Sequence, residues 1–164
     1  MSATEKDLKE AFAGESQANR KYLAFAKKAD QEGYKKVAKL FRAAAEAETV
    51  HAHNHLKELG GIRDTKQNLQ EAMSGEVAEF QSMYPGMIED AKREGNQGAL
   101  KSFTYANEVE KAHAALYEKA IKALDQKGDA EYWVCPVCGM TWEGETPDVC
   151  PVCATKKAAF KKID

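Results

Sequence analysis

Apolar residues recur at steps of three and four through most of the first 127 residues, which is the spacing of one face of an α-helix. Gly33, the pair Gly60–Gly61 and Gly95 interrupt this pattern, and glycine is typical of helix ends. The pattern therefore predicts four helices, over residues 4–30, 34–59, 68–94 and 97–127. Four amphipathic helices of this length predict an all-α four-helix bundle.

Small polar residues mark the expected starts of these helices. Thr4 and Asn68 begin the first and third predicted helices, Asn96 precedes the fourth, and all three are predicted to be caps. Pro85 lies inside the third helix and should kink or loosen it. The link over residues 60–67 is short for a connection along the bundle, so the helices could pair within one chain or between two chains.

Carboxylates and imidazoles interrupt the apolar stripe of every predicted helix. In the second helix the stripe consists of Val37, Leu40, Phe41, Ala44, Glu48, His51 and His55. The interrupting residues of the four helices are Glu15, Glu48, His51, Glu76, Glu79, Glu110 and His113. A buried charge is costly unless another group compensates it. The simplest compensation common to all four helices is a pair of metal ions at the centre of the bundle.

The order of these residues matches a known type of metal site. Glu48 and His51, like Glu110 and His113, form a Glu-x-x-His pair whose side chains lie one turn apart on one helix face. Di-iron carboxylate bundles use two such pairs together with one glutamate from each of the other two helices. Carboxylate-rich ligation of this kind favours iron or manganese over zinc or copper.

Two tyrosines, Tyr22 and Tyr84, are candidates to contact these ligands. Tyr22 follows Glu15 by seven residues and so shares its helix face, where it could hydrogen-bond a ligand carboxylate or simply pack in the core. Tyr84 follows Glu79 by five residues, which on an ideal helix is a different face. Spacing alone leaves both roles open for Tyr22 and gives less support to Tyr84.

The character of the chain changes after Gly128, where Cys, Pro, Gly and Trp replace Ala, Glu and Lys. All four cysteines belong to two Cys-x-x-Cys pairs separated by eleven residues, and they are Cys135, Cys138, Cys150 and Cys153. This arrangement closes a tetrahedral site for zinc or iron. We therefore predict a helical domain over 1–130 and a small metal module over 131–164, whose core contains Trp133, Trp142 and Phe160.

Charge and hydropathy narrow the partners and the cellular compartment that we expect for this protein. The net charge of −2 gives no reason to expect nucleic acid or an anionic membrane as partner. No apolar run approaches the ~18 residues of a membrane span, and the N-terminus does not read as a secretory signal. We expect a cytoplasmic protein, in which clustered cysteines indicate a metal site rather than disulfides.

With these motifs in place, the chain resembles the rubrerythrin family over essentially its whole length. The resemblance rests on Glu15, Glu48-x-x-His51, Glu76-x-x-Glu79 and Glu110-x-x-His113, and on the Cys-Pro-Val-Cys-Gly and Cys-Pro-Val-Cys motifs. It implies a ferritin-like bundle followed by a rubredoxin-like module. Glu79 is the residue that separates this pattern from ferritins and bacterioferritins.

The resemblance also implies roles for these residues. Glu48 and Glu110 would bridge two irons, Glu15 and Glu76 would be terminal ligands, and His113 would bind one iron. Glu79 and His51 would exchange as ligands of the other iron when its redox state changes. Tyr22 and Tyr84 match tyrosines that contact the ligands, and the four cysteines would hold one further iron.

The implied function is a non-haem di-iron peroxidase that reduces hydrogen peroxide to water and acts in oxidative-stress defence. Electrons would reach it through the rubredoxin-like iron from a rubredoxin or an NAD(P)H-dependent reductase, because the chain has no Gly-x-Gly-x-x-Gly dinucleotide motif. A homodimer is expected. The alternatives are a ferroxidase that handles iron, and a zinc-ribbon adaptor on a structural bundle.

Overall fold

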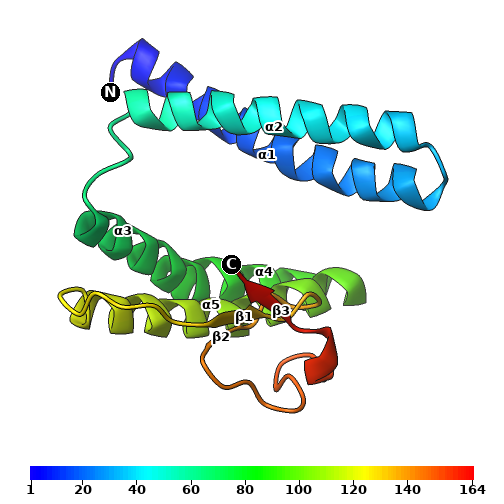
Figure 1. Ribbon diagram of the computed structural model, residues 1–164, viewed down its shortest axis with the longest axis vertical. Helices are drawn as coiled ribbons and strands as arrows, with labels where there is room; N and C mark the ends of the chain where they lie inside the picture. Colours follow the sequence, from blue (N-terminus) through cyan, green and yellow to red (C-terminus); the bar gives the residue numbers. More distant parts are fainter. The chain divides into compact units, whose positions relative to one another are not determined.

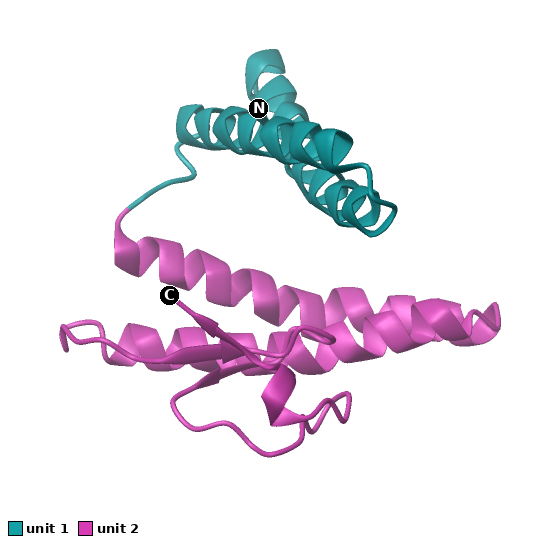
Figure 2. Ribbon diagram, turned by 45° about the vertical axis from the view of Figure 1, so that its right-hand side comes forward, with its two compact units in different colours: residues 1–63 teal, residues 64–164 magenta.

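The computed structural model describes residues 1–164 and divides into two compact units, residues 1–63 and 64–164 (Figure 2). The division falls in the link between the second and third predicted helices. The domain boundary placed after residue 130 stays a prediction. No helix of the structure combines the length and apolar character that crossing a membrane requires.

The first unit is an antiparallel hairpin of two long helices, α1 (Ala3–Gln31) and α2 (Lys35–Glu58) (Figure 1). Gly33 joins them with a φ of 84°, a conformation that a residue with a Cβ rarely adopts. The Tyr34 amide then donates to the Ala29 carbonyl at 2.8 Å, which satisfies an acceptor at the end of α1.

Alanines form the buried seam of this hairpin. Ala38, Ala45 and Ala52 recur every seven residues on α2 and are all buried. The expectation that Val37 and Leu40 belong to the buried stripe is wrong, since both are exposed. Small side chains at the seam allow the two backbones to approach closely, so the larger neighbours point away from it.

The third predicted helix consists of three pieces. These are α3 (Thr65–Ala78), the π-helical segment η1 (Glu79–Met83) and α4 (Tyr84–Arg93). The Tyr84 amide donates to the carbonyl of Glu79, five residues earlier, which is the π-helical spacing. Pro85 follows at once and offers no N–H to the ladder. The local loosening predicted at Pro85 therefore lies in the turn before it.

The observed caps and ends refine the predicted helix limits. Ser2, rather than Thr4, caps α1 by accepting from the Glu5 amide at 3.1 Å. Asp64, rather than Asn68, caps α3 by accepting from the Gln67 amide at 2.8 Å, so this helix begins three residues early. The fourth helix, α5 (Gln97–Lys122), ends before the expected residue 127 and continues as turns.

Asn96 caps α5 as predicted, because its Oδ1 accepts from the Ala99 amide at 3.0 Å. Gly95 precedes it with a φ of 69°, and the Asn96 amide donates to the Ala91 carbonyl at 3.0 Å. The turn from α4 to α5 thus repeats the construction of the turn from α1 to α2.

The C-terminal module is a small antiparallel sheet around the cysteines. Its strands are β1 (Tyr132–Val134), β2 (Thr141–Glu143) and β3 (Lys161–Ile163), in the order β2-β1-β3, with a 3₁₀ turn η2 (Lys157–Ala159) before β3. Phe160 is buried with two of the cysteines, and its ring stacks on Trp142 at a centroid distance of 4.5 Å. Trp133 packs against the same cluster, which confirms the predicted aromatic core.

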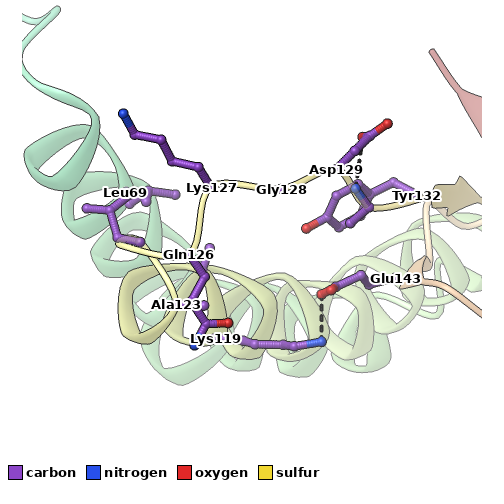
Figure 3. Close-up of a pocket in the computed structure, with 12 residues that line it drawn as sticks. Leu69, Lys119, Ala123, Gln126, Lys127, Gly128, Asp129, Tyr132 and Glu143 are labelled. Carbon is purple, nitrogen blue, oxygen red and sulfur yellow. Dashed lines mark hydrogen bonds and ion pairs between the residues drawn. The ribbon is translucent and has the colours of Figure 1, made fainter.

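The module is held beside α5 by the segment that follows this helix. This segment runs back along α5, and its residues 126–130 border a cavity of about 670 Å³ that is also lined by Leu69 and Tyr132 (Figure 3). Lys119 Nζ of α5 lies 2.9 Å from Glu143 Oε2 of β2 across this cavity. Strand β2 is thereby placed next to the helix that carries Glu110 and His113.

Replacement of Asn96 by alanine should lower the free energy of unfolding by about 1 kcal/mol, because the Ala99 amide loses its acceptor. Asn96→Asp keeps an oxygen at this position and should retain the stability. Urea unfolding followed by far-ultraviolet circular dichroism measures both. Asn54→Ala, at an exposed position within α2, is the control and should cost little. Equal losses for Asn96→Ala and Asn96→Asp would contradict the capping role.

Candidate metal centres

Three of the predicted ligands meet in the first unit. Glu15 of α1 and Glu48 and His51 of α2 each offer a ligand atom, and these atoms lie within 4.8 Å of one another. His51 Nδ1 is 2.8 Å from Glu48 Oε2. The Glu48 side chain is 18% exposed, and that of His51 is 54% exposed.

The second unit repeats this arrangement. Glu76 of α3 and Glu110 and His113 of α5 also have ligand atoms within 4.8 Å of one another. His113 Nδ1 lies 2.7 Å from Glu110 Oε2 and 3.6 Å from Glu76 Oε1. All three side chains are less than a third exposed. Each unit therefore presents one glutamate and one Glu-x-x-His pair in the same relation.

Glu79 stands apart from this second group. It is partly buried and begins the π-helical segment η1, one turn after Glu76. Its negative charge contributes to the raised pKa of Glu76 and of Tyr84. The seventh predicted ligand is thus an electrostatic neighbour of the cluster, on a stretch of helix whose geometry differs from that of its surroundings.

The electrostatics of this cluster favour a cation. Burial raises the pKa of Glu76 to about 7, helped by the hydrogen bond with Glu110 and by the charges of Glu110 and Glu79. These carboxylates repel one another, and a divalent ion between them would reverse the repulsion. Oxygen donors with one imidazole per unit suit iron, so the residues present fit a di-iron centre.

Two tyrosines of the second unit lie close to the same carboxylates. Burial raises the pKa of Tyr84, and the charges of Glu79, Glu110 and Glu76 raise it further. The pKa of Tyr117 is raised in the same way by burial and then by Glu76 and Glu110. Both phenols stay protonated and remain available as hydrogen-bond donors.

Tyr22 is found in an aromatic cluster of the first unit. Its ring centroid lies 6.4 Å from that of Phe25 and 6.2 Å from that of Phe41. These contacts match the core reading of this residue that the spacing left open. A role beside the ligands stays a prediction.

A cavity of about 370 Å³ adjoins Glu76 and His113. Helices α3 and α5 and strands β1 and β2 contribute its walls, through Leu69, Leu116, Tyr117, Ala120, Tyr132 and Thr141. Most of these side chains are apolar or aromatic, and the metal-ligand candidates form one polar wall. This volume gives a small molecule access to the carboxylate cluster.

The four cysteines converge on one point in the module. Their sulfur atoms all lie within 4.8 Å of one another, with Cys135 and Cys153 at 3.5 Å and Cys138 and Cys150 at 3.5 Å. None forms a disulfide. This is the arrangement of a closed tetrathiolate site with no open position.

The cysteine pKa values reflect the crowding of thiols. Burial raises the pKa of Cys138 strongly, and hydrogen bonds with the other three thiols raise it further. Burial also opposes ionisation of Cys153, but hydrogen bonds from the Thr155 hydroxyl and amide, with those of Cys138 and Cys135, lower its pKa to about 6. A bound cation would allow all four sulfurs to ionise.

Sequence comparison identifies both parts of the chain. The family described as Rubrerythrin matches residues 6–121, and the one described as Rubrerythrin, rubredoxin-like domain matches residues 133–161. Rubrerythrin-2 of Clostridium acetobutylicum is 35% identical over 94% of this chain and 93% of that protein. Nigerythrin of Nitratidesulfovibrio vulgaris is 36% identical over 98% of this chain and 86% of that protein.

Solved structures agree with these matches. A structure of fully reduced, all-ferrous nigerythrin aligns with a TM-score of 0.61 and 34% identity, over 99% of this chain and 88% of that one. The fold is therefore a ferritin-like helical bundle followed by a rubredoxin-like module, with residues for a di-iron centre and a four-cysteine iron site. The chain belongs to the rubrerythrin family.

Sequence reasoning missed two residues of this region, Tyr117 and Thr141. Tyr117 follows Glu110 by seven residues, the same relation that drew attention to Tyr22, so the spacing contained a signal. Thr141 is in the four-cysteine module, far along the chain from the helical ligands. No local pattern connects it with His113, and only the packing of β2 on α5 brings the two together.

The pKa of Glu76 predicts how the metal-free protein responds to pH. Because the native pKa is about 7 and the unfolded one about 4.5, this group's favourable contribution is complete below about pH 4.5. It falls as the pH rises and is lost above about pH 7. Glu76→Gln should therefore be more stable than the wild type at pH 8 and equally stable at pH 4, as measured by thermal unfolding of metal-free protein. The exposed Glu145→Gln is the control, and an unchanged pH profile in Glu76→Gln would refute this assignment.

Proposed function

We propose that this protein is a non-haem di-iron peroxidase that reduces hydrogen peroxide to water, with electrons supplied through its four-cysteine iron. The observation that supports this most directly is the composition of the second unit. One compact unit holds Glu76, Glu110 and His113 together with the tetrathiolate module. A ferroxidase has no use for such a module, and an adaptor has none for the carboxylates.

The proposed ligands follow the two repeated groups. When iron is bound, Glu48 and Glu110 would be ligands shared by both ions, and Glu15 and Glu76 would be terminal ligands. His113 would hold one iron, and His51 and Glu79 would be alternative ligands of the other. Two observations support this exchange: the His51 side chain is 54% exposed, and Glu79 begins a π-helical turn whose geometry differs from that of the helices on either side.

Reduction of one peroxide to two waters consumes two electrons and two protons. Iron bound at these residues supplies the electrons for cleavage of the O–O bond. The protein surroundings orient and protonate the oxygens. Tyr84 and Tyr117 keep their protons, because burial and the charges of the nearby carboxylates raise their pKa values. The cavity beside Glu76 and His113 admits a molecule of the size of peroxide.

Electrons are proposed to arrive one at a time at the four-cysteine site, from a rubredoxin or an NAD(P)H-dependent reductase in the cytoplasm. A closed tetrathiolate site cannot bind substrate, so electron transfer is the chemistry left to an iron there. We also propose a homodimer. Exposed apolar side chains on the first unit, including Phe25, Leu40 and Val50, offer surface for such an assembly.

The choice of oxidant tests the proposed function. In anaerobic stopped-flow experiments the reduced protein should be reoxidised much faster by hydrogen peroxide than by dioxygen. The visible absorption of an iron–thiolate site reports the second metal centre in the same experiment, whereas a zinc-loaded module is colourless. A preference for dioxygen would move the assignment to an oxidase or ferroxidase.

Glu79→Ala separates a redox-linked ligand from a structural residue. Peroxide turnover should fall by about tenfold or more, as for other residues that tune a metal site. Stability should change by less than about 1 kcal/mol, because Glu79 is only partly buried. Glu89→Ala, on α4 and paired with Lys92 at the surface, is the matched control. Parallel loss of turnover and folding in Glu79→Ala would count against the ligand role.

A further inference from the structure

A hydrogen bond connects the carboxylate–histidine cluster of the second unit with the four-cysteine module. His113 Nε2 of α5 lies 2.9 Å from the Oγ1 atom of Thr141, the first residue of β2. The same hydroxyl lies 3.0 Å from the carbonyl oxygen of Gly139. Gly139 follows Cys138 directly in the first Cys-x-x-Cys motif. The contact therefore runs from a helical ligand candidate to the backbone that shapes the cysteine site.

The donors and acceptors of these three groups allow one arrangement of the protons. The Gly139 carbonyl can only accept, so Thr141 donates its single proton to it. Thr141 Oγ1 then has only lone pairs for His113, and Nε2 must carry the proton. The other ring nitrogen, Nδ1, faces Glu110 Oε2 at 2.7 Å and Glu76 Oε1 at 3.6 Å. Nδ1 is thus the nitrogen directed at the carboxylates.

We propose that Thr141 is a positioning residue that fixes the tautomer and ring orientation of His113, so that Nδ1 is presented to iron. This inference rests on the proposed role of His113 as an iron ligand. A ligand histidine usually donates its second N–H to a carboxylate, a carbonyl or water. Here a hydroxyl of the four-cysteine module takes that place. The docking of the module thereby sets the geometry of the helical centre.

The two histidines of the repeated groups differ in this respect. The His113 side chain is 27% exposed and is held on both ring nitrogens. The His51 side chain is 54% exposed and is held at Nδ1 by Glu48. Thr141 thus makes His113 the fixed imidazole of the pair and leaves mobility to His51.

The first test observes the imidazole protons directly. Full-length protein with ¹⁵N-labelled histidine and zinc at both the cysteine site and the helical ligands should show His113 protonated at Nε2 and unprotonated at Nδ1 near pH 8, because the metal takes the Nδ1 lone pair. In Thr141→Val the Nε2 proton should exchange with water at least about tenfold faster, while the His51 signals stay unchanged. Thr141→Ser keeps the hydroxyl and should restore slow exchange. Wild-type exchange in Thr141→Val would overturn the proposal.

The second test measures affinity with Co²⁺ alone as the probe. Binding at the helical site should weaken by about tenfold in Thr141→Val and recover in Thr141→Ser. Glu143→Gln breaks the ion pair with Lys119 but spares the hydroxyl, and it should bind Co²⁺ as the wild type does. Equal weakening in Glu143→Gln or in Thr141→Ser would show a general docking effect and overturn the positioning role. Failure of peroxide reduction, with these results intact, would instead refute only the proposed peroxidase activity.

Discussion

The structure depends on the cost of placing carboxylates of like charge on the partly buried faces of packed helices. Glu76 shows this cost, since burial and its neighbours Glu110 and Glu79 raise its pKa to about 7. Without a cation such a cluster opposes folding around neutral pH. Metal binding removes the opposition and links the stability of the helical region to the chemistry that the ions perform.

Folding of the C-terminal module also depends on metal binding. Strands of three residues and one aromatic cluster bury too little apolar surface to hold a domain of this size. The four cysteine sulfur atoms lie within 4.8 Å of one another, and a metal ion bound to them would hold the module together. The module then rests on α5 through Glu143 and Thr141. The four-cysteine site and the carboxylate cluster thus share one helix as their common support.

Much of the helical architecture follows from local rules. Glycine and asparagine at the turns, period-3.6 patterning and the in-register glutamates are properties of short segments, which explains why Asn96 and the two Glu-x-x-His pairs lie where expected. The predictions of helix caps and seam residues that were wrong also have local physical causes. Ser2 and Asp64 cap helices because their oxygens reach the first amides, and alanines replace Val37 and Leu40 at the seam because they permit closer packing.

The sequence by itself determined the donor sets, because each Glu-x-x-His pair and each Cys-x-x-Cys pair is local and its geometry follows from one turn of backbone. Tertiary structure alone decided which distant residues meet those ligands. The contact of Thr141 with His113 requires a strand to pack on a helix that ends well before it. Such pairings depend on how elements dock, and no periodicity in the chain encodes them.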